Sequence, residues 1–231
     1  MIEMRRLLLL LYLSVVTVSF SQEIEERKIP VDSLFREDQF YFSITYNLLR
    51  NAPSGYSQYS FSSGVTLGFL RDMPITKDRK WAIGLGLGYS YNDIKHNLKI
   101  ATDASSAQNS YSIDNTYNKS KLRLHYVEVP LEIRWRNASY DSHKFWRIYT
   151  GFKVSYLFAS KSIFESNTES YGIRNSNELT KIQYGPYLSV GYNTINLYAY
   201  YGLKSNFDQV KIGDKDLGLN SFNVGFIFYI L

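Results

Sequence analysis

Cysteine is absent from the 231 residues of this chain. Disulfide bonds, thiolate catalysis and cysteine-based metal sites are therefore excluded, and so is a lipoprotein anchor, which needs a cysteine to carry its acyl chains. The formal charge is +5, yet the sequence has no basic helix and no basic run interleaved with aromatic residues. A nucleic-acid partner is therefore not expected.

Long hydrophobic runs are also missing, because no stretch after the first twenty residues holds about eighteen consecutive apolar residues. Helical membrane spans are thus not expected. Mean hydropathy is only -0.26, but aromatic residues make up 16% of the chain, with 21 Tyr and 14 Phe. This combination fits a sheet in which apolar side chains occupy alternate positions and face lipid on one side.

The first 21 residues have the three parts of a secretory signal peptide. Arg5 and Arg6 supply positive charge, an apolar run follows from Leu7 to Val18, and Ser19-Phe20-Ser21 offers small residues to a signal peptidase. We expect cleavage before Gln22. The alternative is a retained membrane anchor, but the apolar run is shorter than the ~20 residues that a spanning helix needs.

Residues 22–37 are charged and lack periodicity, so we predict a periplasmic N-terminal extension there. Beyond them the pattern has period two, most clearly in residues 81–91. One face of this segment carries large side chains, from Trp81, Ile83, Leu85, Leu87, Tyr89 and Tyr91. The other face carries small ones, from Ala82, Gly84, Gly86, Gly88 and Ser90. A large apolar face opposite a tiny face suits a narrow barrel, in which space inside is scarce.

Eight segments show this alternation, and closed bacterial barrels have an even number of strands. The predicted strands are 40–48, 59–69, 81–91, 127–135, 146–158, 182–192, 195–204 and 222–230. The sequence therefore predicts an all-β fold over residues 38–231, a closed eight-stranded antiparallel transmembrane β-barrel of the outer-membrane type. We expect it in the outer membrane of a Gram-negative bacterium, surrounded by lipid, with both termini periplasmic.

The predicted connections mostly alternate between long and short, as in outer-membrane barrels with long outer loops and short periplasmic turns. Long connections are expected at 93–120 and 160–180, and short ones at 137–143 and 193–194. The loop 49–57 and the turn 72–80 have similar lengths and fit this rule poorly. An interfacial aromatic girdle is expected beside the short turns, from Trp81, Trp135 and Trp146.

Two prolines, Pro130 and Pro186, lie inside predicted strands, although a closed barrel has no edge to accommodate them. We expect a β-bulge at each. The apolar phase also slips over residues 124–127, which predicts a further bulge on the strand 127–135.

Charged residues are predicted inside the barrel, where Glu128 and Glu132 both point. Pairing the flanking strands about the 137–143 turn places Glu128 opposite Lys153 and Glu132 opposite Tyr149. Because buried charges must be paired, we predict a structural network that plugs the lumen, while a catalytic carboxylate pair is the alternative. The network comprises Glu128, Glu132, Arg134, Arg147, Tyr149 and Lys153.

The rest of the sequence holds only weak indications of nucleotide binding, metal binding or catalysis. The run Gly84–Gly88 resembles a nucleotide-binding glycine loop, but it lacks the strand–turn–helix context and its glycines share one strand face. The three histidines, His96, His125 and His143, fall on separate segments. We predict no catalytic residue, no cofactor, no metal and no small-molecule substrate.

Residues 124–136 (LHYVEVPLEIRWR) and 144–153 (KFWRIYTGFK) resemble the PorT family of outer-membrane barrels. The resemblance implies a role in the type IX protein secretion system, as an accessory or assembly component rather than an enzyme. It also implies partners among the other secretion-system proteins, and a part in gliding motility in some members. It brings no catalytic residues with it.

Two other functions remain open beside the secretion role. One is a small pore or adhesion barrel of the same superfamily, although eight strands leave little room for a pore. The other is an outer-membrane barrel enzyme, which a convergent Asp/His or Ser/His set at the loop rim would indicate. If the protein works by docking, the candidate surfaces are the long loops and the segment 22–37.

Overall fold

The structure is a computed structural model that describes residues 38–102, 109–137 and 145–230. The predicted signal peptide, its cleavage before Gln22, the extension 22–37 and His143 lie outside the described residues. None of the described residues forms a helix long and apolar enough to cross a membrane.

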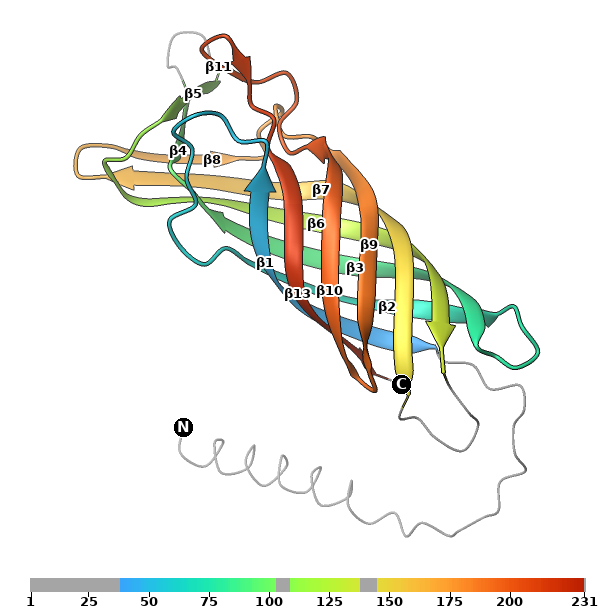
Figure 1. The fold of residues 1–231 in the computed structure, drawn as a ribbon. Helices are drawn as coiled ribbons and strands as arrows, with labels where there is room; N and C mark the ends of the chain where they lie inside the picture. Colours follow the sequence, from blue (N-terminus) through green and yellow to red (C-terminus); the bar gives the residue numbers. More distant parts are fainter. Residues whose placement is uncertain (1–37, 103–108, 138–144, 231) are drawn as a thin grey trace, which may run out of the picture. The chain divides into compact units, whose positions relative to one another are not determined.

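Eight strands close into a barrel in which every neighbouring pair is antiparallel (Figure 1). The β1–β13 and β6–β7 pairings complete the circle. The prediction of a closed eight-stranded antiparallel barrel is therefore confirmed. The barrel strands are β1 (Gln39–Arg50), β2 (Ser63–Pro74), β3 (Trp81–Lys95), β6 (Tyr117–Arg136), β7 (Trp146–Ser166), β9 (Ile182–Tyr192), β10 (Ile195–Ser205) and β13 (Asn220–Ile230).

Among the described residues, five short strands lie outside this circle. β4 (Leu98–Thr102) and β5 (Asn109–Ile113) form a hairpin, as do β11 (Lys211–Ile212) and β12 (Lys215–Asp216). β8 (Ser170–Arg174) pairs with the far end of β7. β6 and β7, of 20 and 21 residues, are the longest strands and run past the others, as Figure 1 shows.

The alternation of side chains follows the predicted faces. On β3 the outward Leu85 and Leu87 are 48% and 61% exposed, whereas the inward Ala82 is fully buried. A sheet surrounded by lipid has its large apolar residues on the outside, the reverse of a water-soluble sandwich.

The connections fall into two sets at opposite ends of the barrel (Figure 1). The turn end has the short connections 75–80, 137–145 and 193–194. The loop end has the long connections 51–62, 96–116, 167–181 and 206–219.

The poor fit at the first two connections came from placing the second strand too early. β2 begins at Ser63 rather than at Tyr59, and it continues to Pro74. The Tyr59 hydroxyl instead donates to the Ser120 carbonyl at 2.8 Å. The connection 51–62 is therefore long and the turn 75–80 short, so the alternation of lengths holds around the whole barrel.

The structure shows no β-bulge at either proline, so those two predictions are wrong. On the β3 side Pro130 has no partner, and the register is the same on both sides of this gap. Pro186 pairs in register with Phe152 of β7 and lies one residue beyond the last pair of β9 with β10. Each proline thus has no paired residue on one neighbouring strand, which accommodates its missing N–H.

The bulge predicted near residues 124–127 exists, but on the other strand. The register of β6 and β7 shifts between His125 and Tyr126, and the extra residue is Phe158 on β7. β6 keeps its phase, with Leu122 and Leu124 buried inside. In the sequence these leucines look like a shift of the apolar alternation to the outward face. They are apolar because the inside of the barrel is apolar at this level.

The three tryptophans lie at the turn end, as predicted. Trp81 pairs directly with Trp135 across β3 and β6. The ring of Trp146 lies 5.7 Å from that of Tyr192 on β9. Such aromatic side chains mark the level at which a barrel leaves the lipid.

Candidate functional site

Two parts of the molecule carry unusual polar chemistry, the lumen and the loop end. Within the lumen, Asp72 of β2 lies between two arginines of β6. Its two carboxylate oxygens accept hydrogen bonds from Arg134 and Arg136, each at 2.9 Å. All three side chains are fully buried. Charge pairing of this kind is what a buried carboxylate requires.

Glu132 extends this cluster toward the middle of the barrel. It accepts a 2.7 Å hydrogen bond from Arg134 Nε, a 2.8 Å bond from the Tyr187 hydroxyl and a 3.4 Å bond from the Tyr229 hydroxyl. The Arg134 guanidinium also lies over the Tyr149 ring, 4.9 Å from its centroid. Glu132 is thus held by one cation and two hydroxyls from three different strands.

Glu128 and Lys153 form a second buried pair nearer the loop end. The ammonium lies 3.0 Å from both carboxylate oxygens. Ser155 donates to the same carboxylate at 3.4 Å, and the Lys153 ammonium lies 4.3 Å from the centroid of the Tyr200 ring. The pair is therefore bidentate and packed against an aromatic face.

The register of β6 and β7 differs by two residues from the predicted one. Glu128 lies directly opposite Ser155, and Glu132 opposite Gly151. The predicted opposite positions of Glu128 with Lys153 and of Glu132 with Tyr149 are therefore wrong. Lys153 still reaches Glu128 diagonally, because a long side chain spans the distance to the next position along the partner strand.

Arg147 of β7 lies directly opposite Arg136 of β6. Its side chain lies at the turn end, donates to the Asn193 carbonyl and covers the Phe145 ring at 4.4 Å. Two residues that the sequence reasoning missed, Asp72 and Arg136, also lie in the network. Extending the alternation of the second strand beyond Phe69 would have placed Asp72 on the inward face.

The glycines of β3 make room for these side chains. A Cβ atom at Gly88 would lie 2.1 Å from the Tyr41 hydroxyl, and one at Gly84 would lie 2.7 Å from Arg134 Nε. The run Gly84–Gly88 is therefore a packing surface inside a narrow barrel.

The remaining space in the lumen is small. Two cavities of about 20 Å³ each flank the Glu128–Lys153 pair. A single water needs about 10–15 Å³ measured in this way, so each cavity holds about one water. Side chains thus fill the barrel at this level.

The loop end carries its own hydrophobic core. We call this part the loop-end cap; it comprises residues 96–102, 109–124, 157–181 and 206–219. Its apolar side chains pack together over the barrel mouth, joining strands from both ends of the chain. Leu49, Ile94 and Tyr126 of the adjoining barrel strands complete this core. Its buried members in the cap are Leu98, Ile100, Leu122, Leu124, Leu157, Leu179, Phe207, Val210, Leu217 and Leu219.

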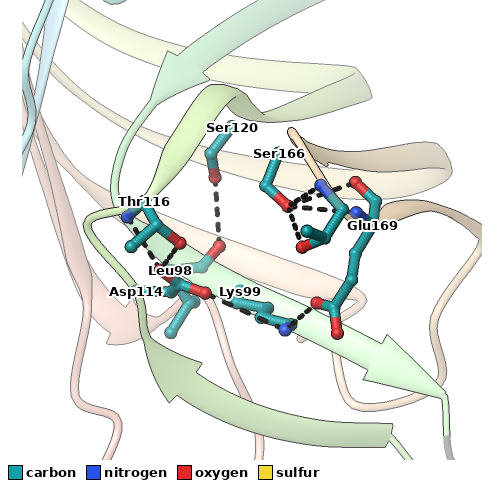
Figure 2. A network of polar contacts seen from close by, with 8 residues as sticks. Leu98, Lys99, Asp114, Thr116, Ser120, Ser166 and Glu169 are labelled. Carbon is teal, nitrogen blue, oxygen red and sulfur yellow. Dashed lines mark hydrogen bonds and ion pairs between the residues drawn. The ribbon is translucent and has the colours of Figure 1, made fainter.

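A lysine fastens β4 to neighbouring segments of the cap, as Figure 2 shows. The Lys99 ammonium lies between the carboxylates of Asp114, at 3.8 Å, and Glu169. It also lies over the Phe164 and Tyr171 rings, 5.4 and 5.3 Å from their centroids. The hydrogen bond with Glu169 raises the pKa of Lys99. The cap is therefore held by specific polar contacts in addition to its apolar core.

His96 is buried in the cap beside Tyr56, with 6.1 Å between the ring centroids. Its Nδ1 accepts a 3.0 Å hydrogen bond from the Leu98 N–H, so Nδ1 carries no proton. Burial lowers the pKa of His96 to about 4. The histidine is thus a neutral packing residue at physiological pH. Within the described residues no three His, Asp or Glu side chains are grouped to bind a metal.

Residues 20–208 match the family described as "Outer membrane protein beta-barrel domain". The chain therefore belongs to this family, and its location is the outer membrane. No match is found among curated protein sequences.

Two solved structures of Ail, the attachment invasion locus protein of Yersinia pestis, are similar to this chain. One, in complex with the heparin analogue sucrose octasulfate, has 14% sequence identity and a TM-score of 0.38. The other has 13% identity and a TM-score of 0.36. Each match covers 84% of this chain and 99% of Ail.

Proposed function

We propose that this protein is a non-conducting, non-enzymatic outer-membrane barrel that binds other proteins through its loop-end cap, as an accessory component of the type IX secretion system. The cap is the observation that carries this proposal. In the described residues, three long connections there share a hydrophobic core, and the Lys99 contacts hold two of them together. Long, structured connections of this kind are commonly functional.

The proposed orientation places the cap outside the cell. Outer-membrane barrels have short periplasmic turns and longer extracellular loops. Phe40 of β1 pairs with Ile230 of β13 at the turn end, so both ends of the barrel lie beside the short turns. Both termini would then be periplasmic.

A pore is the less favoured function, because side chains occupy the lumen. The Glu128–Lys153 pair crosses it, and the cavities beside that pair hold about one water each. A conducting channel needs a continuous polar path.

The secretion setting rests on the resemblance of residues 124–136 and 144–153 to the PorT family. Residues 124–136 lie on β6 and residues 146–153 on β7, the two strands that contribute most of the lumen charges and continue into the cap. The two strands that carry the resemblance therefore continue, beyond the resembling residues, into the proposed docking surface.

Adhesion is the second candidate, since an ordered cap on the cell surface would also serve to bind a host or another cell. The cap is rich in Ser and Asn, residue types suited to adaptable contacts. The two candidates differ in whether loss of the protein affects export or attachment.

Gene deletion followed by complementation tests the proposal. The deletion strain should retain type IX cargo inside the cell while membrane integrity survives. Replacing residues 99–113, most of the β4–β5 hairpin, with a short Gly-Ser linker should reproduce the export defect although the barrel still inserts.

The matched control replaces the turn 75–80 with the same linker, and it should restore export. Normal cargo export in the deletion strain would remove the secretion role. If such a strain also attached poorly to surfaces, the adhesion function would take its place.

A further inference from the structure

The outward face of β3, β6, β7 and β8 carries a group of cations just beyond the apolar band. The pairing aligns Asp93, Arg123, Lys161 and Arg174 in one row, each opposite the next. Side chains of directly opposite residues point to the same side of a sheet. The next row contains Lys95, Lys121, Ile163 and Gly172. We call the five cations of these rows the basic face: Lys95, Lys121, Arg123, Lys161 and Arg174.

The height of the basic face coincides with the edge of the lipid. Along the outward side of β6 the residues from Trp135 to Val127 are apolar, and His125 follows. Trp135 to His125 spans about ten residues, or about 33 Å of strand, which is about 25 Å along the barrel axis at a tilt of ~40°. The apolar band of an outer-membrane barrel is about 25 Å tall. Arg123, the next outward residue, therefore lies at the level of the lipid headgroups.

Aromatic side chains mark the same boundary. The Tyr89 hydroxyl lies 2.8 Å from His125 Nδ1, and the Phe158 ring lies 6.1 Å from that of His125. Aromatic rings of this kind form the interfacial girdle of a barrel. The basic face thus adjoins a surface made for acyl chains.

The basic face has too few carboxylates of its own. Asp93 lies 3.5 Å from Arg123 and 3.9 Å from Lys121, and it is the only acid in the two rows. In the described part of the chain no carboxylate lies within 4.0 Å of the charged groups of Lys95, Lys161 or Arg174.

Like charges also lie directly opposite one another. Lys161 is paired on one side with Arg123 and on the other with Arg174. Such an arrangement destabilises a sheet unless an anion lies between the charges. Space for one exists beside Arg174, because a Cβ atom at Gly172 would meet no atom within 4 Å.

We propose that the basic face binds the phosphate groups of a phosphorylated glycolipid in the outer leaflet. Phosphate offers several acceptor oxygens to arginine and lysine, and its charge would relieve the repulsion around Lys161. The acyl chains of the same lipid would lie on the apolar surface below, next to Phe158 and Val127. A soluble polyanion would leave that apolar surface unused. This inference rests on the proposed outward orientation of the loop end.

Native mass spectrometry of the refolded, purified mature protein tests the inference. The protein in detergent is titrated separately with diphosphorylated lipid A, with the same lipid lacking phosphates, and with phosphatidylglycerol. We expect the wild type to prefer diphosphorylated lipid A. At about 1 kcal/mol per cation near a charged membrane surface, Lys161→Gln with Arg174→Gln should weaken this binding roughly thirtyfold.

The matched control is Lys204→Gln with Lys215→Gln, which removes two exposed loop-end cations outside the basic face. It should bind lipid A as the wild type does, and heat-modifiable migration on gels verifies that every variant folds. The inference would be overturned if the two double variants bound diphosphorylated lipid A equally well. It would also be overturned if the wild type bound the dephosphorylated lipid as tightly as diphosphorylated lipid A.

Equal or tighter binding of phosphatidylglycerol, or of a sulfated polysaccharide in place of lipid A, would also overturn it. None of these outcomes depends on cargo export. Failure of this inference is therefore distinguishable from failure of the proposed docking function.

Discussion

Removing the carboxylate of Asp72 should destabilise the barrel strongly, because Arg134 and Arg136 both depend on it. Asp72→Asn keeps the shape of the side chain but leaves two buried guanidinium groups facing a neutral amide. Breaking a buried ion pair by removing one partner costs about 3–5 kcal/mol. Glu132 still neutralises Arg134, so we expect about 3 kcal/mol rather than the upper value.

Urea unfolding of the protein in lipid vesicles, followed by tryptophan fluorescence, measures this loss. With a slope of about 2 kcal/mol per molar urea, the midpoint should fall by about 1.5 M. Asp78→Asn is the matched control, because its pair with Lys80 is exposed to solvent, which screens the attraction, so the midpoint should not change measurably. Equal midpoints for Asp72→Asn and the wild type would refute the account of the lumen.

Three further predictions concern single contacts. Glu128→Ala should cost about 3 kcal/mol, and adding Lys153→Met should recover much of it, since the unpaired ammonium is then gone; equal midpoints for the single and double variants would contradict this. Gly88→Ala should cost about 1–3 kcal/mol through overpacking against the Tyr41 hydroxyl, and much less in a Tyr41→Phe background. Because burial lowers the pKa of His96 from 6.5 to about 4, its stability contribution is complete above pH 6.5 and falls by up to about 3 kcal/mol as the pH drops to 4. His96→Phe should abolish that part of the pH dependence of unfolding.

The barrel itself was predictable because lipid imposes a strict rule on every strand. Outward positions must be apolar, so residues such as Leu85 and Leu87 alternate with the glycines and Ala82. This alternation of apolar outward and small or polar inward residues no longer holds at the loop end, beyond the lipid. Leu122 and Leu124 are apolar and face inward, because the cap replaces the polar lumen with a hydrophobic core at that level.

The candidate sites were less predictable, since they depend on register and on distant strands. The pairing of β6 with β7 differs by two residues from the one inferred from the turn, which changes every opposite pair. Asp72 reaches Arg134 and Arg136 only because β2 and β6 both lie beside β3. The alternation of residues within a single strand cannot show that these three side chains are close together.

Photo-crosslinking in living cells tests the docking role most directly. A photoreactive residue is placed at exposed positions of the cap, Asn167 or Gln209, and as a control at Lys77 in the turn 75–80. We expect adducts of the cap positions with a protein of the type IX system, identified by mass spectrometry, and none with such a protein from Lys77. Adducts from Lys77 alone, or none from either cap position in cells that export cargo normally, would contradict the docking role.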